Sequence, residues 1–224
     1  QTATYTITPI FNGCSGTAFT VVISVNPKPA IANVVPAAIC SGSAFSVTPT
    51  NGSGNIVPSG TTYTWTTPIS NPVGAITGGT AQATGVATIS QTLTNTTTAP
   101  ATLEYTVTPT SGACAGTPFT ITVTVNPTPT TLGLTNQTYC NGIPTTQFVL
   151  TNGVSGTTYA WTNSNTAIGL AASGTGNIPV FTPTNSGTAP ISATISVIAS
   201  ANGCSRAAET YTITVNPSPA VSFS

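Results

Sequence analysis

The chain is almost without charge. Only 2% of its 224 residues are charged, and the formal net charge is zero, whereas a typical soluble domain has about 25% charged residues. The two cations, Lys28 and Arg206, cannot neutralise the phosphates of a nucleic acid or form a polybasic membrane patch. No apolar run is long enough to span a bilayer. We therefore expect no nucleic-acid partner and no membrane insertion.

Groups that perform catalysis are equally scarce. The chain has no His, and its two acidic residues are both Glu, at Glu104 and Glu209. Without His, the usual acid–base group at neutral pH is missing. The two Glu lie in different repeats, which argues against a paired-carboxylate hydrolase, and side chains cannot supply the several carboxylates of a calcium site. We predict that the chain is not an enzyme and uses no metal or cofactor.

Threonine and β-branched residues take up much of the remaining sequence. In the segment FTITVTV at 119–125, apolar residues alternate with Thr, which predicts a strand with one buried and one solvated face. Tyr105 and Val107 alternate in the same way before a Gly turn, so the two segments predict a hairpin. No stretch has helical periodicity. Short strands separated by Gly, Pro, Asn and Ser predict an all-β fold of tandem immunoglobulin-like or PKD-like antiparallel β-sandwiches.

Internal repetition is the strongest pattern. YTITPIFNGCSGTAFTVVISVNPKP at 5–29 returns as YTVTPTSGACAGTPFTITVTVNPTP at 105–129, and NGCSRAAETYTITVNPSP at 202–219 is a third copy. Related Cys-containing segments begin at Ile39 and Tyr139. We divide the chain into the C-terminal hairpin of a truncated repeat (1–29), a first repeat (30–129), a second repeat (130–219) and the start of another (220–224).

The repeats end in the same short joint. Each joint has the form Asn-Pro-x-Pro, at 26–29, 126–129 and 216–219. Alternate prolines fix φ and bias the preceding residues toward extended backbone. We expect semi-rigid joints and an elongated array.

Each complete repeat has a Tyr-x-Trp segment in a predicted central strand. The aromatic pairs are Tyr63 with Trp65, and Tyr159 with Trp161. This pattern is typical of core packing in an immunoglobulin-like sandwich, and we assign all four side chains to the core. The alternative is an exposed platform on which a sugar ring stacks.

Five cysteines occur, without a CxxC spacing. Disulfides are the favoured interpretation. The simplest pairing is within each repeat, Cys40 with Cys114 and Cys140 with Cys204, which leaves Cys14 unpaired in this fragment. In a seven-strand sandwich, however, the first loop and the last hairpin turn lie at opposite ends. A bond between adjacent repeats, Cys40 with Cys204, is therefore the alternative.

Three N-glycosylation tripeptides begin at Asn51, Asn95 and Asn136. In a chain so rich in Asn and Thr, chance matches are expected. We do not assign glycosylation to them.

The pattern ICSG … YTWT … GAITG … ISQTLTNTT … YTVTPTSGACAGTPFTITVTVNPTP, from Ile39 to Pro129, resembles the PKD-like repeat domains of Bacteroidetes surface proteins. Residues 139–219 fit the same pattern more loosely. The resemblance implies export by the type IX secretion system and an extracellular location on the bacterial cell surface. It also implies a place in giant adhesins that act in gliding motility or biofilm formation.

Three hypotheses follow for function. The leading one is a structural stalk or spacer of a repetitive surface adhesin or fibre, in which the neighbouring repeats of the same chain are the partners. The second is a self-assembling filament, in which identical chains complete open sheet edges by strand addition or bundle through uncharged Thr faces. The third is a carbohydrate-binding accessory module, which requires exposed aromatic side chains.

Overall fold

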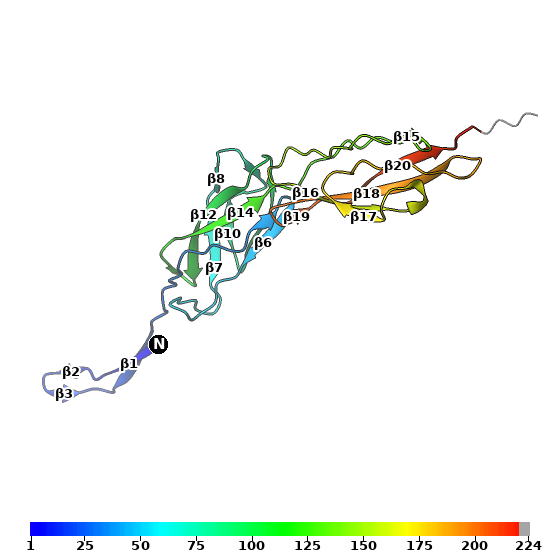
Figure 1. The fold of residues 1–224 in the computed structure, drawn as a ribbon. Helices are drawn as coiled ribbons and strands as arrows, with labels where there is room; N and C mark the ends of the chain where they lie inside the picture. Colours follow the sequence, from blue (N-terminus) through cyan, green and yellow to red (C-terminus); the bar gives the residue numbers. More distant parts are fainter. Residues whose placement is uncertain (220–224) are drawn as a thin grey trace, which may run out of the picture. The chain divides into compact units, whose positions relative to one another are not determined.

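The computed structural model describes residues 1–219, and these are nearly all strand, turn and loop (Figure 1). The prediction of an all-β fold is confirmed. The helical element among these residues is one 3-10 turn, η1 (Thr166–Ile168). No helix in the described part is long and apolar enough to cross a membrane. The predicted start of another repeat, 220–224, lies outside the described residues.

Contacts divide the chain into two compact units. The first unit comprises Gln1–Ile39, Ser43–Leu93 and Thr102–Thr124. The second unit contains the chain from Val125 onward together with two short earlier segments, Cys40–Gly42 and Thr94–Ala101. Two pieces of the first sequence repeat therefore cluster with the second repeat.

In the first unit, the leading segment 1–29 forms a separate antiparallel hairpin. It consists of β1 (Thr2–Ile7), β2 (Ile10–Phe11), β3 (Cys14–Ser15) and β4 (Phe19–Ser24). Its apolar side chains are exposed, for example Tyr5 at 54%. The matching residue of the first repeat, Tyr105, is fully buried, because there the hairpin is covered by the rest of its sandwich.

The first repeat is a two-layer sandwich. One layer has the strand order β10-β7-β12-β14-β5, with β8 and β13 also paired to β12, and the other has the order β6-β11-β9. The rings of Phe45 and Tyr105, one from each layer, lie 5.2 Å apart in the core. The strands are β5 (Ile39–Cys40), β6 (Ser43–Val47), β7 (Thr62–Trp65), β8 (Ile69–Asn71), β9 (Ile76–Thr77), β10 (Gln82–Val86), β11 (Ile89–Asn95), β12 (Ala101–Ser111), β13 (Cys114–Ala115) and β14 (Phe119–Asn126).

The second repeat, within the second unit, keeps one regular layer. Its strand order is β15-β20-β18-β16-β17, with β19 paired to β18. Facing this layer, loops replace the regular strands, and the backbone bonds between Phe148 and Ile178 form the pairing there. The strands are β15 (Gln137–Cys140), β16 (Thr158–Asn163), β17 (Ser173–Thr175), β18 (Ile191–Ala201), β19 (Cys204–Ser205) and β20 (Glu209–Asn216).

The two repeats build a Tyr–Phe contact from different strands, with the rings tilted by 50° in the first repeat and stacked at 15° in the second. In the first repeat, Tyr105 of β12 packs against Phe45 at 5.2 Å between ring centres. In the second repeat, the position matching Tyr105 is Ile195 of β18, and the Tyr is instead Tyr211, on the neighbouring strand β20. Tyr211 packs against Phe148, again at 5.2 Å. The aromatic residue has therefore moved to the cross-strand partner position, and the core stays filled.

The indole of Trp161 packs directly on the backbone of Gly174 in the neighbouring strand β17. A methyl group at Gly174 would overlap this buried ring. We expect Gly174→Ala to lower the free energy of unfolding by about 1–3 kcal/mol, as overpacking does. The control is Gly153→Ala, where the nearest atom outside the adjacent residues, Thr98 Cγ2, would be 3.6 Å from the new methyl group. Urea unfolding checks both variants, and equal stability of the two would contradict the packing described.

Burial of the Tyr211 phenol predicts alkaline sensitivity. Burial raises the pKa of Tyr211 from 10.0 to about 12, and its hydroxyl has no hydrogen-bond partner in the described structure. The unfolded chain then ionises first as pH rises, so this contribution is intact below pH 10 and is lost as pH rises toward 12. Tyr211→Phe should therefore flatten the fall in stability over this interval, measured by unfolding at several pH values. An identical fall in both proteins would refute the assignment.

Candidate functional site

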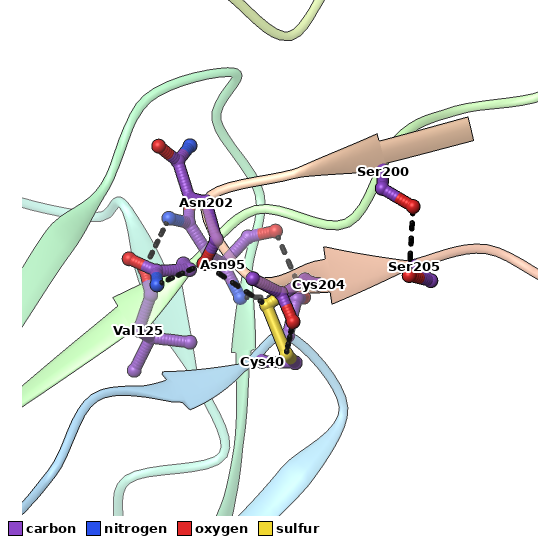
Figure 2. The surroundings of a disulfide bond; sticks show 10 residues. Cys40, Asn95, Val125, Ser200, Asn202, Cys204 and Ser205 are labelled. Atoms are coloured by element: carbon purple, nitrogen blue, oxygen red, sulfur yellow. Dashed lines mark hydrogen bonds between the residues drawn. A yellow bond between two sulfur atoms is a disulfide. The ribbon is translucent and has the colours of Figure 1, made fainter. Parts of the chain in front are cut away.

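A disulfide joins Cys40 to Cys204, with a Cα–Cα distance of 5.6 Å. Figure 2 shows the bond where β5 meets the turn that leads into β19. Both cysteines belong to the second unit. In sequence they are 164 residues apart, so the bond links the first strand of one repeat to the last hairpin of the next.

The preferred pairing within repeats is wrong for this structure, in which Cys14, Cys114 and Cys140 are free. The reason is strand length. The backbone N–H of Ser41, beside Cys40, donates to the carbonyl of Asn126 at the end of β14, whereas Cys114 precedes the start of the same strand. Eight residues of strand span roughly 23 Å, and a disulfide needs Cα atoms about 4.4–6.8 Å apart. The alternative pairing, Cys40 with Cys204, is the one that the structure contains.

The hairpin turn presents Cys204. Asn202 and Gly203 both adopt left-handed backbone, with φ of 51° and 79°, which is the Asn-Gly conformation of a tight two-residue hairpin turn. Behind the turn, the hydroxyls of Ser200 and Ser205 are 2.8 Å apart across the hairpin. The Cys204 side chain is thus held at the tip of a rigid hairpin.

A buried amide holds the Cys40 side of the bond. The Asn95 side chain donates to the carbonyls of Ala99 and Val125, each at 2.8 Å. Its backbone N–H donates to the Ser41 hydroxyl at 3.0 Å, so the residue after Cys40 is fixed to the same network. Asn95 is 7% exposed, which leaves no room for a glycan at this tripeptide in the folded chain.

A second contact lies beside the disulfide. The Asn126 side-chain amide, from the Asn-Pro-x-Pro joint at 126–129, donates to the Asn202 carbonyl at 2.8 Å. The joint prolines Pro127 and Pro129 are buried. The disulfide and this amide hydrogen bond therefore both hold the turn at Asn202–Cys204.

The charged residues of the second repeat hold the chain just after the joint. Glu209 accepts from the backbone N–H of Leu132 through both carboxylate oxygens, at 3.2 Å each. Arg206 pairs with Glu209 at 2.7 Å and donates to the Thr131 hydroxyl at 3.2 Å. This role has no signature in the sequence, because the partners are a backbone group and a Thr far along the chain.

The predicted core residues fall in the two sandwiches. Tyr63, Trp65 and Trp161 are buried, and Tyr159 is partly buried against the core of the second repeat. The Trp65 indole donates to the Thr80 carbonyl at 2.9 Å. Among residues 1–219, no three Cys or Glu side chains are grouped so that they could hold a metal. The chemistry that the described residues offer at this site is that of thiols and amides.

The architecture defines a class of protein built from tandem β-sandwich modules. The sequence of this chain matches the family model described as PKD-like domain. The match covers residues 1–29 and 37–129, which is more than half of the chain. The chain therefore belongs to the PKD-like domain family. A search of curated proteins finds no match.

Several solved structures resemble this chain at low sequence identity. DIP-gamma IG1+IG2 shares 8% identity at a TM-score of 0.42, over 85% of this chain and 98% of that one. Human mucin-like protocadherin EC1-2 shares 12% at 0.32, over 86% and 98%. Mouse cadherin-23 EC22-24 shares 13% at 0.35, over 86% and 67%. With TM-scores below 0.5, these likenesses carry no further argument.

The observed pairing predicts a specific thiol count. The unfolded, unreduced chain should react at three cysteines, Cys14, Cys114 and Cys140, whereas pairing within repeats would leave one. Cys40→Ser should expose a fourth thiol and cost roughly 2–5 kcal/mol of stability, as loss of a native disulfide does. Cys114→Ser is the matched control and should leave the melting temperature unchanged. A single reactive thiol in the parent chain would refute the pairing.

Proposed function

We propose that this chain is a tension-bearing spacer in the stalk of an extracellular, repetitive cell-surface adhesin or fibre. The observation that carries the proposal is the Cys40–Cys204 bond, whose cysteines are 164 residues apart. It acts through its covalent connectivity. The chain has no His for proton transfer, and the disulfide favours a mechanical role over a catalytic one.

The bond changes which part of the chain feels a pull. When tension is applied to the two ends, it passes along the backbone to Cys40, through the sulfur–sulfur bond, and onward from Cys204. The residues between the two cysteines form a closed loop outside this path. Unfolding of either sandwich then releases none of that loop as added length, so the spacer keeps its reach under load.

Two observations support an extracellular location, namely the disulfide and the family match. Structural disulfides persist in oxidising compartments and are rare in the cytosol. The PKD-like family match adds to this, and the sequence resemblance extends it to type IX-secreted Bacteroidetes adhesins on the cell surface. In that setting the spacer would hold a binding domain away from the cell, in adhesion, gliding motility or biofilm formation.

Self-assembly into a filament is the second candidate. The leading hairpin favours it, because side chains that match core positions of the first repeat are exposed there, including Phe19 at 52% and Ile23 at 47%, which match the buried Phe119 and Val123. An identical chain that covered this face would bury them. The carbohydrate-binding alternative needed exposed indoles, and Trp65 and Trp161 are buried.

Single-molecule stretching tests the spacer proposal. The full chain is held by its two ends and extended, first unreduced and then with a reductant. Reduction should add the length of the loop, roughly 550 Å at about 3.3–3.6 Å per residue. Unfolding before reduction should release the segments outside the loop alone.

Matched variants separate the bond from other effects of the reductant. Cys40→Ser should show the longer extension without reductant, whereas Cys114→Ser should behave as the parent chain does. If the unreduced parent chain extends as far as Cys40→Ser, the loop is not shielded and the proposal fails.

A further inference from the structure

We propose that the Cys40–Cys204 bond is one member of a periodic series, in which the first-strand cysteine of each repeat bonds to the last-hairpin cysteine of the repeat that follows. Cys140 is then a binding position for the hairpin cysteine of a further PKD-like repeat. The inference rests on the spacer function proposed above and specifies its covalent partner.

The chain contains two copies of the structure that holds the hairpin, in which a first-strand cysteine lies beside a joint. Beside Cys40, the N–H of Ser41 donates to the carbonyl of Asn126 at 2.8 Å. Beside Cys140, the N–H of Asn141 donates to the carbonyl of Asn216 at 3.0 Å, and Cys140 lies opposite Asn216 in the register of β15 and β20. Each copy therefore sets a first-strand cysteine next to the Asn of an Asn-Pro-x-Pro joint.

A buried Asn supports both copies in the same way. Asn95 donates to the carbonyl of Val125, the residue before Asn126, at 2.8 Å. Asn185 donates to the carbonyl of Val215, the residue before Asn216, also at 2.8 Å. The N–H of Asn185 donates to the Asn141 side chain at 2.9 Å, as that of Asn95 donates to Ser41. The second copy thus has the framework that positions the first.

Only the first copy is filled. Its cysteine is bonded to Cys204 and its Asn126 amide donates to the Asn202 carbonyl. In the second copy, Cys140 is an exposed free thiol. The side-chain amide of Asn216 has no hydrogen-bond partner within residues 1–219. The same two functional groups that grip a hairpin in the first copy are present and unused in the second.

The chemistry of the partner is defined by the hairpin that the first copy holds. It is a β-hairpin whose turn offers a carbonyl two residues before a cysteine, as at Asn202 and Cys204. The chain contains this unit twice more, with free cysteines at Cys14 and Cys114 and left-handed backbone at Asn12 and Gly112. Under the proposed rule, these two would pair with the first-strand cysteine of a preceding repeat, which explains why neither pairs with Cys140.

Bond formation needs an oxidant, and a low-molecular-weight disulfide such as oxidised glutathione supplies it. The Cys140 thiol and the hairpin thiol each lose one electron and one proton, and their sulfurs join. The glutathione disulfide accepts two electrons and two protons and leaves as two thiols, so atoms and electrons balance.

The test extends the chain by one repeat of its own sequence. A second copy of residues 30–129 is joined after Pro219, so that an Asn-Pro-x-Pro joint precedes it as it precedes the second repeat. Cys14, the original Cys114 and the appended copy of Cys40 are changed to Ser. Four cysteines remain, namely Cys40, Cys140, Cys204 and the hairpin cysteine of the appended repeat.

The extended chain is equilibrated in a glutathione redox buffer, its free thiols are alkylated, and it is digested with pepsin and analysed by mass spectrometry without reduction. Cys140 should be bonded to the appended hairpin cysteine, and Cys40 to Cys204. The Cys40–Cys204 bond reports folding in the same molecule. Alkylated Cys140, or Cys140 bonded to another cysteine, overturns the inference, as does the absence of the Cys40–Cys204 bond.

Asn216→Ala tests the amide contact separately. Loss of one hydrogen bond should weaken the Cys140 bond about fivefold in its equilibrium with glutathione, while the Cys40–Cys204 equilibrium stays unchanged. If the Cys140 bond has the same equilibrium constant with glutathione in both proteins, Asn216 does not stabilise the junction. The stretching experiment on the unextended chain does not involve Cys140, so failure of the periodic series and failure of the spacer function have different signatures.

Discussion

The structure depends most on the two contacts that hold one hairpin turn, Asn202–Cys204. The Cys40 sulfur and the Asn126 amide both reach the turn at Asn202–Cys204. This explains why Cys40–Gly42 clusters with the second unit rather than with the strands that follow it in sequence. Since the cysteines are 164 residues apart, the contacts at this single turn close most of the chain into one covalent loop.

An almost uncharged sequence must satisfy its polar groups by other means, and here side-chain amides do so. Asn95 and Asn185 are buried and each donates to two carbonyls, one in its own loop and one at the end of a neighbouring strand. A buried amide with its hydrogen bonds made costs little, whereas a buried charge needs a partner. The repeated Asn residues thus do what charged side chains do in other proteins, in a chain with one Lys, one Arg and no Asp.

Sequence alternation predicted much of the fold, because a period of two specifies which face of a strand is buried. The segment at 119–125 follows that rule, with Phe119, Ile121, Val123 and Val125 buried. The cysteine pairing was not predictable in the same way. Repeat spacing shows which cysteines match, but pairing depends on where the two ends of β14 lie. The opposite placement of the first loop and the last hairpin turn in a seven-strand sandwich already argued for the alternative. The Asn126 contact could have been found from the recurring Asn of each joint, but its acceptor is a backbone carbonyl, which has no sequence signature.

Thermodynamics alone does not account for a bond placed so far along the chain. In the loop-entropy model, closing a loop of this length contributes about 5 kcal/mol, comparable to the lower end of the stability of a whole domain. That gain is complete only if everything between the cysteines unfolds at once. Two sandwiches that open separately would realise only part of it. The restriction on end-to-end length, in contrast, holds whether one repeat, both or neither is folded, because it follows from connectivity. A spacer that must keep its length under load benefits from that property even after its cores have failed.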